Sequence, residues 1–309
     1  MMREHRFRAM NTDVAAWLWS DSVLAQVRLG EIEALFTQVE AELSRFRPAS
    51  GLSRLNAMAG AGPQQISPLF QTVLGAALDA ADESSGIFDP TVLDSLCRTG
   101  YDRSFELLST MDGNRYATHE RDLNRIGWRQ IDLDTSSGTA RLPAGLGLDL
   151  GGIAKGWAVD RATEMLTSWG AALVDAGGDL RATAAPDGEP WPIAVQDPFD
   201  AMNDLFVISL TEGTMATSSI GKRRWERDGQ AMHHLIDPRS GLPSQSDLHT
   251  VTVLAPTVVE AEVAAKVALI LGQHAGLRYL NERGLTGVLI GVNRRLELVG
   301  NLQIADTVS

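Results

Sequence analysis

The sequence predicts an α+β fold with mixed sheets and flanking helices. Segments with strand character are numerous, and short turns that predict hairpins join several of them. Apolar stripes at helical spacing lie between the strands, but the two do not alternate as a regular βαβ series would. No linker or low-complexity stretch divides the 309 residues, so we expect a single domain spanning residues 1–309.

The first third of the chain combines one strand with two helices. Residues 13–19 fit a strand, and the apolar stripe through residues 29–43 marks a helix with one face in the core. Residues 44–56 are polar and rich in arginine, and taken alone they predict a solvated loop. A serine cap and a first-turn proline begin the next helix at residue 67, and it ends near residues 84–86.

The middle of the chain predicts one hairpin ahead of a glycine-rich stretch. The Asp-Pro pair in residues 88–92 predicts a turn, and such turns often do no more than separate two elements. Residues 97–128 are polar and irregular. Residues 130–134 and 139–142 flank a Thr-Ser-Ser-Gly turn, which predicts the hairpin. An extended run over residues 140–150 then leads into the most informative segment of the chain.

That segment, residues 149–160, reads Asp-Leu-Gly-Gly-Ile-Ala-Lys-Gly-Trp-Ala-Val-Asp. The helical spacing behind it stops at Gly170, so we expect a strand, a glycine turn and a helix. Gly151 and Gly152 permit positive φ and a close approach of a ligand to the backbone. Free N–H groups at the helix start, with Lys155 beside them, suit an anion. A tight turn with a solvated lysine is an equally good interpretation, because the motif is neither a Walker A loop nor G-x-G-x-x-G.

The second half of the chain adds a further glycine turn. Residues 171–180 fit a short buried strand that ends in Gly177-Gly178-Asp179, where exposed backbone lies beside a carboxylate. Further strands are expected at residues 191–198, 205–210, 250–254, 285–292 and 296–299, the last two as a hairpin, and further helices at 260–271, behind a capping box begun by Thr257, and at 275–283.

Residues 215–241 are polar and contain the adjacent histidines His233 and His234. Neighbouring side chains on a strand point to opposite faces, so these two do not chelate one metal together. One of them is a candidate general base and the other an exposed residue. For a histidine considered alone, a structural role is the favoured interpretation.

Composition excludes several classes of partner. A net charge of −12 argues against nucleic acid or an anionic membrane. With Cys97 as the single cysteine, neither an intramolecular disulfide nor a cysteine metal cluster is possible. The charged N-terminus lacks an apolar run behind it, and no stretch of apolar residues is long enough to span a bilayer. We therefore expect a cytoplasmic protein that binds neither membrane nor nucleic acid.

Segments that are ambiguous one by one occur in a known order, and together they resemble the ApbE family, the FAD:protein FMN transferases, over nearly the whole chain. The matching segments are Met10-Asn-Thr12 and residues 44–56, 86–92, 149–160, 177–179, 216–218 and 234–241, with the helix after Thr257. Any one of them is a weak signal, whereas seven or eight in register are a strong one. The resemblance implies an ApbE-like fold of two intimately packed α+β lobes with a flavin between them.

The resemblance also implies an activity and its residues. Such enzymes cleave the FAD pyrophosphate, attach FMN to a threonine or serine of a partner flavoprotein and release AMP. FAD and an acceptor flavoprotein are thus the expected partners, with His234 and Asp237 as catalytic residues and His234 as the base. The implied FAD-binding residues are Met10, Ser50, Asn56, Phe88, Asp89, Asp149, Gly152, Lys155, Asp160, Gly177, Gly178, Asp179, Ser218, Arg239 and Lys266. The backbone near Ala154 and the side chain of Glu262 would lie at the magnesium ion.

One departure from the family makes Mg²⁺ doubtful. Family members usually carry an aspartate and, four residues later, a threonine that bind the metal, where this chain has Glu262 and Lys266. A protonated lysine is no metal ligand and repels the ion. Three outcomes fit, in order of preference: Lys266 replaces the metal, the chain is an FAD-binding flavoprotein that has lost transfer, or a displaced metal binds through Glu262.

Overall fold

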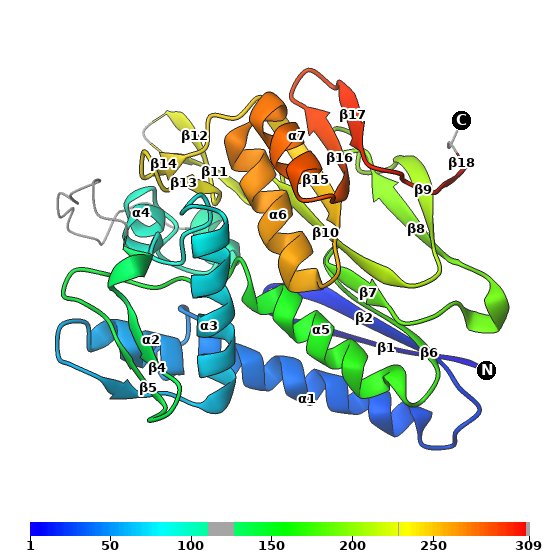
Figure 1. Cartoon of the computed structure of the whole chain (residues 1–309), viewed down its shortest axis with the longest axis horizontal. Helices are drawn as coiled ribbons and strands as arrows, with labels where there is room; N and C mark the ends of the chain where they lie inside the picture. The colour runs from blue at the N-terminus through cyan, green and yellow to red at the C-terminus, as the bar shows by residue number, and fades with distance from the viewer. Residues whose placement is uncertain (111–126, 228, 307–309) are drawn as a thin grey trace. The chain divides into compact units, whose positions relative to one another are not determined.

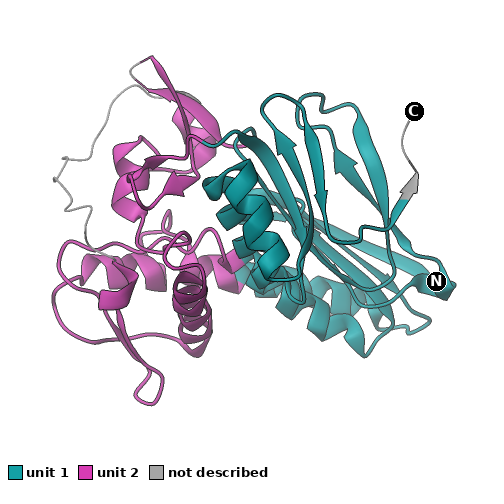
Figure 2. Cartoon of the chain, turned by 45° about the horizontal axis from the view of Figure 1, so that its top comes forward, with its two compact units in different colours: residues 1–37, 155–221, 246–309 teal, residues 38–154, 222–245 magenta. Residues whose placement is uncertain are grey.

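The strands and helices belong to two units, each assembled from separate stretches of the chain (Figure 2). The computed structural model describes residues 1–110, 127–227 and 229–306. Unit 1 consists of residues 1–37, 155–221 and 246–309, and unit 2 of residues 38–154 and 222–245. A single domain of two intimately packed lobes was expected, and the packing of the two lobes stays a prediction.

The elements of unit 1 follow the chain in this order: β1 (Met2–Ala9), β2 (Thr12–Trp19), the first part of α1 (Ala25–Leu43), α5 (Ala154–Thr167), β6 (Ala171–Ala176), β7 (Leu180–Ala182), η3 (Pro186–Gly188), β8 (Trp191–Gln196), β9 (Asp204–Leu210), β10 (Gly213–Ser219), β15 (Leu248–Leu254), α6 (Val258–Leu271), α7 (Gln273–Glu282), β16 (Thr286–Gly291), β17 (Leu296–Val299) and β18 (Ile304–Asp306). Unit 2 contains the end of α1, α2 (Gly51–Ala57), β3 (Gln64–Gln65), α3 (Pro68–Glu83), α4 (Leu93–Arg98), η1 (Phe105–Thr110), η2 (Trp128–Gln130), β4 (Asp132–Asp134), β5 (Thr139–Arg141), β11 (Arg224–Arg227), β12 (Gln230–His233), β13 (Ile236–Asp237) and β14 (Leu242–Pro243).

Unit 1 is built on one large sheet with the strand order β1-β2-β6-β7-β10-β15-β16-β17 among the described residues. Helix α6 packs on β10 and β15, and α7 packs on α6 and β16 (Figure 1). The α+β class is therefore confirmed. Mixed sheets were expected, but every neighbouring pair of strands in this sheet is antiparallel.

A three-stranded sheet of β8, β9 and β18 covers the other face of the large sheet. Trp191, Phe206 and Ile208 of the small sheet pack with Met215 of β10 and Val288 of β16. Side chains alternate between the two faces of a strand. Met215 faces the small sheet, so the residues before and after it on β10 face the opposite side, where α6 lies. Ser218, three positions after Met215, faces that side too.

Unit 2 combines helices with short strand pairs. Strands β4 and β5 form the predicted hairpin, and β3 pairs with the outer side of β5. Ser67 caps α3 by accepting the N–H of Phe70 at 3.2 Å, as its sequence predicts. The expected solvated loop at residues 44–56 is wrong for its second half, which forms α2 behind the capping residue Ser50.

Other predicted boundaries shift by a few residues or lie outside the described part. Thr257 caps α6 by accepting the N–H of Glu260, but the helix already begins at Val258. Strand β10 was not expected, because its sequence is polar. Of the irregular stretch 97–128, residues 111–126 lie outside the described residues.

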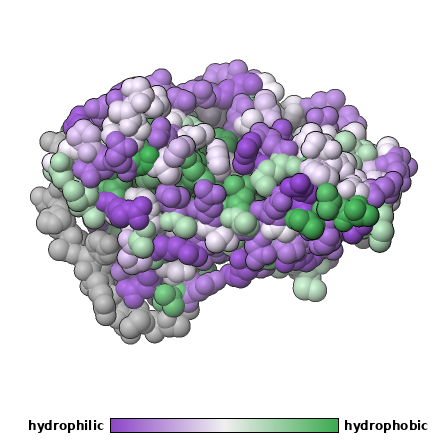
Figure 3. Space-filling model, turned by 90° about the horizontal axis from the view of Figure 1, so that it is seen from below, coloured by the Kyte–Doolittle hydropathy of each residue, from purple (hydrophilic) through white to green (hydrophobic). Residues whose placement is uncertain are grey.

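The described surface seen in Figure 3 is largely hydrophilic. On the face seen in Figure 3, hydrophobic residues form small groups among hydrophilic ones. Large exposed apolar side chains, such as Val23 and Met202, are spread along the chain. Within the described residues, every helix is too short or too polar to cross a bilayer.

Candidate functional site

The candidate site residues are divided between the two units. Unit 2 carries Ser50, Asn56, Phe88, Asp89, Asp149, Gly152, Ala154, His234, Asp237 and Arg239, and unit 1 carries Met10, Lys155, Asp160, Gly177, Gly178, Asp179, Ser218, Glu262 and Lys266. Each set is described within its own unit.

The turn that begins at Asp149 is closed by this residue's own side chain. Its carboxylate accepts the N–H of Gly151 at 2.9 Å, and the carbonyl of Leu150 accepts the N–H groups of Ile153 and Ala154. Neither Gly151 nor Gly152 takes the positive φ that glycine permits. The predicted strand ahead of the turn is also absent from the described residues 142–150. The chain instead turns in the right-handed sense, straight into α5.

Arg45 holds the other side of the Asp149 carboxylate. Its Nε lies 2.6 Å from Oδ2 of Asp149, and its side chain is only 6% exposed. The guanidinium lies over the rings of Phe46 and Tyr101, at 4.1 and 4.5 Å from their centroids. The expectation of a solvated residue is therefore wrong for Arg45, because ion pairing and two cation–π contacts bury it.

Two further contacts fix the chain that leads into the Asp149 turn. The Asn56 side chain donates to the carbonyl of Leu148 at 2.9 Å and accepts the Leu148 N–H at 2.8 Å. The Asp149 N–H is bound by the carbonyl of Pro90, and Asp89 accepts both the N–H and the hydroxyl of Thr91. These predicted ligand-binding residues thus have well-defined structural roles in unit 2.

Ser50 and Phe88 are also part of the framework of unit 2. Ser50 is buried and accepts the N–H of Ser53 at 3.0 Å, which caps α2. Phe88 is 4% exposed, and its N–H donates to the hydroxyl of the buried Ser84. Their predicted contact with FAD stays a prediction.

In unit 1, the N-terminal turns of α5 and α6 are joined by two carboxylates. Glu262 of α6 accepts the N–H of Gly156 in α5 at 2.8 Å. Asp160 of α5 accepts the N–H of Val259 in α6 at 3.1 Å. First-turn N–H groups have no acceptor within their own helix, and they carry its positive dipole end. A carboxylate of each helix therefore neutralises the start of the other helix. Free N–H groups were expected at the start of α5, but the Gly156 N–H is bound to Glu262 and is not available to an anion.

Gly156 is required for this arrangement. A Cβ at this position would lie 2.8 Å from Oε2 of Glu262 and 3.0 Å from the carbonyl oxygen of Val258. The first distance is shorter than a carbon–oxygen contact allows, and the second is tighter than usual, to a Val258 backbone that cannot turn away. The two helix starts approach this closely because residue 156 has no side chain.

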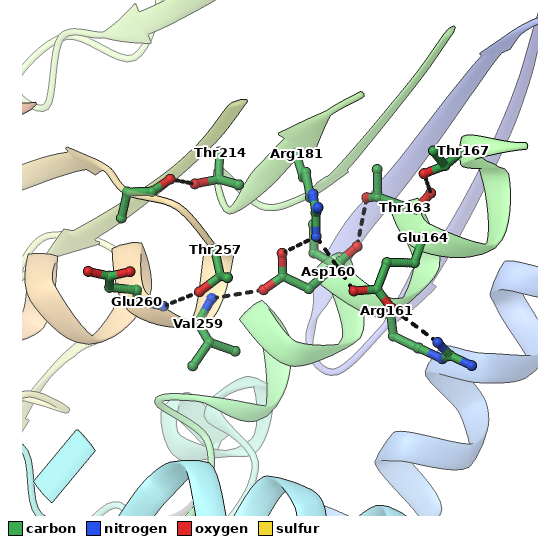
Figure 4. Close-up of polar contacts among 12 residues, drawn as sticks. Asp160, Arg161, Thr163, Glu164, Thr167, Arg181, Thr214, Thr257, Val259 and Glu260 are labelled. Atoms are coloured by element: carbon green, nitrogen blue, oxygen red, sulfur yellow. Dashed lines mark hydrogen bonds and ion pairs between the residues drawn. The ribbon is translucent and has the colours of Figure 1, made fainter. Parts of the chain in front are cut away.

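Asp160 has a second partner in the same unit. Its Oδ1 lies 3.0 Å from Nη1 of Arg181 on β7, and the same guanidinium is 3.8 Å from the exposed Glu164 (Figure 4). Burial raises the pKa of the Asp160 carboxyl, against the lowering effect of the α6 backbone N–H groups and of Arg181. Asp160 therefore connects α5, α6 and the large sheet.

The second glycine turn is half-buried, where exposed backbone was expected, and it takes a left-handed conformation. Gly177 and Gly178 have φ values of +69° and +98°, which suit glycine. The following Asp179 is 1% exposed, forms an ion pair with Lys155 and accepts the N–H of Thr217 at 3.2 Å. The interpretation of Lys155 as a solvated lysine is thus wrong, because Asp179 draws its ammonium towards the sheet.

The hairpin turn between β1 and β2 lies beside this glycine turn. Met10 and Asn11 both take positive φ, at +51° and +59°, as a two-residue hairpin turn requires. A Cβ added at Gly177 would overlap the hydroxyl of Thr12. Methionine rarely adopts this conformation, and such residues occur at functional sites more often than elsewhere. Within unit 1, the structure therefore places Thr12, which follows the Met10-Asn11 turn, against Gly177, and it pairs Lys155 with Asp179.

The two histidines of unit 2 have different environments. His233 is 8% exposed, its Nε2 lies 3.0 Å from the carbonyl of Ser244, and its Nδ1 accepts the N–H of Leu235. Burial lowers the pKa of His233, which favours the neutral ring that these two contacts need. The expectation that one histidine is exposed is therefore wrong, since His233 is buried and His234 is half-buried.

Residues 237–241 form a compact turn after His234. Asp237 accepts the backbone N–H of Arg239 at 2.9 Å and binds its guanidinium through both carboxylate oxygens. The Asp237 carbonyl accepts the N–H of Gly241 at 2.8 Å. Asp237 and Arg239 thus hold the turn that follows His234, and the catalytic and FAD-binding roles expected of them stay predictions.

The residues at the family's metal position do not fit Mg²⁺. Glu262 is 7% exposed and its carboxylate is bound to the start of α5, while Lys266 is half-buried on the same helix. At about 6 Å, the spacing of such helical neighbours, an ammonium repels a divalent cation by roughly 5 kcal/mol at an effective dielectric of about 20. No group of three His, Cys, Asp or Glu side chains arranged to hold a metal occurs within the described residues.

Solved structures of ApbE proteins share this fold. The ApbE protein of Thermotoga maritima superposes with a TM-score of 0.86 over 97% of both chains at 24% sequence identity. The flavinyl transferase ApbE of Pseudomonas stutzeri, in its apo form, superposes with a TM-score of 0.80 over 98% of this chain and 95% of that one, at 25% identity. These likenesses confirm the predicted fold.

The chain belongs to the ApbE family, whose family model matches residues 10–289. The FAD:protein FMN transferase of Treponema pallidum is 31% identical over 285 residues, which cover 87% of this chain and 78% of that one. That of Haemophilus influenzae is 32% identical over 274 residues, covering 84% and 77%. The family resemblance found in the sequence is thereby confirmed.

Several supporting residues could not be found from the sequence. Arg45, His233 and Arg181 hold predicted site residues or their neighbours, but nothing in their local sequence distinguishes them from solvated or structural residues. Their partners are distant along the chain. The order of the motifs was the signal for the candidate site. It identifies the motif residues themselves, but not the partners whose side chains fix them in place.

Proposed function

We propose that this chain is an FAD:protein FMN transferase. In the reaction, the hydroxyl oxygen of an acceptor threonine or serine bonds to the FMN phosphorus. The bond from that phosphorus to the bridging pyrophosphate oxygen breaks, and AMP leaves with this oxygen. The observation that carries the proposal is the similarity to transferases of that name over more than three quarters of both chains.

The roles of the residues follow from their chemistry. Phosphoryl transfer needs charge neutralisation, positioning and a group that takes up the hydroxyl proton. His234 is the proposed base, and Asp237 with Arg239 orients its loop, which the compact turn supports. Met10, Lys155, Gly177 and Gly178 are the proposed FAD contacts in unit 1, with Lys155 as the cation for the phosphates. The N–H of Gly178 is not available to them, because it donates to Oδ1 of Asp175 at 2.8 Å.

FAD and an acceptor flavoprotein are the proposed partners, and the acceptor is recognised through the threonine or serine that it presents. The cytoplasmic location expected from the sequence stays a prediction. The alternative of a flavin-binding protein without transfer is not favoured, because the relatives are named for the transferase activity.

The test measures AMP release from FAD by chromatography and covalent flavin fluorescence on an added acceptor flavoprotein. Both are followed in EDTA and then in excess Mg²⁺. We expect AMP and flavinylated acceptor in equal amounts from the wild type, and a loss of at least about 100-fold in His234→Ala, the usual size of a general-base effect. The matched control is His274→Ala, at an exposed position on α7. Bound FAD that yields neither product under either condition contradicts the proposal.

A further inference from the structure

Glu262 and Lys266 bear on how this chain would bind FAD. That FAD is the ligand is taken from the proposed function. Glu262 is one methylene longer than the aspartate usual in the family, and its carboxylate reaches the N–H of Gly156 at 2.8 Å. It therefore serves as a cap of α5. Lys266 follows one helical turn later, on the same side of α6.

We propose that this chain binds no Mg²⁺ at α6 and that Lys266 supplies the positive charge for the pyrophosphate oxygens of FAD. The aspartate–threonine pair of other members carries a net charge of −1, which suits a divalent cation. Glu262 and Lys266 together carry no net charge, and an ammonium has no lone pair for a metal. A lysine ammonium does bind phosphate oxygens, as a point charge.

The role of Lys266 in the reaction is electrostatic. As the bond from the FMN phosphorus to the bridging oxygen breaks, negative charge grows on the phosphate of the leaving AMP. The ammonium balances that charge and keeps its own proton. The acceptor hydroxyl loses the one proton that moves, so the reaction balances without a metal.

The first experiment measures metal binding directly. Mn²⁺ replaces Mg²⁺ as the probe, because its free form has an EPR signal that disappears on binding. We expect the wild-type chain to leave this signal unchanged up to about 1 mM Mn²⁺, with and without FAD after correction for Mn²⁺ held by FAD itself. One Mn²⁺ bound per chain at micromolar concentration would overturn the inference while leaving the transferase proposal intact.

The second experiment measures FAD affinity by quenching of flavin fluorescence. The wild-type dissociation constant should be equal in EDTA and in Mg²⁺, and Lys266→Gln should weaken binding by about tenfold in both, the usual loss for one charged phosphate contact. Lys222→Gln, at an exposed lysine, is the matched control and should bind as the wild type does. Binding that needs Mg²⁺ in the wild type, or equal binding by Lys266→Gln, contradicts the inference.

Discussion

His233 makes the stability of this protein depend on pH in a way that can be calculated. Its ring accepts the N–H of Leu235 at Nδ1 and donates to the carbonyl of Ser244 from Nε2. A protonated ring cannot accept, so protonation would break the contact to Leu235 and leave two donors face to face. The two bonds anchor the residues on either side of His234, the proposed base.

The sign follows from the lowered pKa of His233, which burial causes first and the charge of Arg224 assists. The unfolded chain takes up a proton near pH 6.5, the usual histidine value, whereas the folded chain resists it. The contribution of His233 to stability is therefore complete above this pH and is lost as the pH falls. If the folded ring stays neutral, the loss by pH 5.5 is RT ln 11, about 1.4 kcal/mol.

Urea unfolding followed by tryptophan fluorescence at pH 7.5 and 5.5 tests this calculation. We expect the wild type to lose more stability between the two pH values than His233→Gln, which cannot titrate, with a difference of at most about 1.4 kcal/mol. His274→Gln, at an exposed position, controls for the replacement itself and should keep the wild-type stability at pH 7.5. Equal losses in the wild type and in His233→Gln would refute the anchoring role of the neutral ring.

Two further predictions concern unit 1, and both are read out by urea unfolding. Asp160→Ala removes the acceptor of one first-turn N–H of α6 and of the Arg181 guanidinium, so we expect the free energy of unfolding to fall by about 2–3 kcal/mol. The control Glu164→Ala removes the exposed neighbour 3.8 Å from the same guanidinium and should cost less than about 0.5 kcal/mol. Equal losses in the two variants would contradict this assignment. Gly177→Ala combines a positive φ with an overlap on Thr12 and should cost at least about 2 kcal/mol. Gly188→Ala, whose added Cβ meets nothing within 4 Å, should cost only about 1 kcal/mol, and an equal cost at both glycines would show that Thr12 yields.

Local chemistry predicted the elements whose signals lie within a few residues. Ser67 and Thr257 cap the helices that their sequences indicate, and the hairpin of β4 and β5 forms around its predicted turn. In each case the interacting groups are close along the chain, so neighbouring residue types determine the outcome.

Local residue types did not predict the outcome where a specific side-chain partner decides the conformation. Glycines at 151 and 152 permit a positive φ but do not require one, and the Asp149 carboxylate closes a right-handed turn instead. Arg45 lies in a polar segment, yet Asp149 and two aromatic rings bury it. Strand β10 is polar in sequence yet largely buried between β7 and β15, and hydrophobic patterning did not reveal it.

The two bonds between α5 and α6 explain why a change at Glu262 involves more than a metal ligand. Asp160 neutralises the start of α6 and Glu262 neutralises the start of α5, so each carboxylate is held by the helix that it caps. The longer side chain of glutamate reaches the Gly156 N–H, and the absent side chain of glycine leaves room for it. A carboxylate fixed in this way has less freedom to turn towards a cation. Under the proposal made above, Glu262 joins the two helices while Lys266, one turn later on α6, supplies the positive charge at the pyrophosphate.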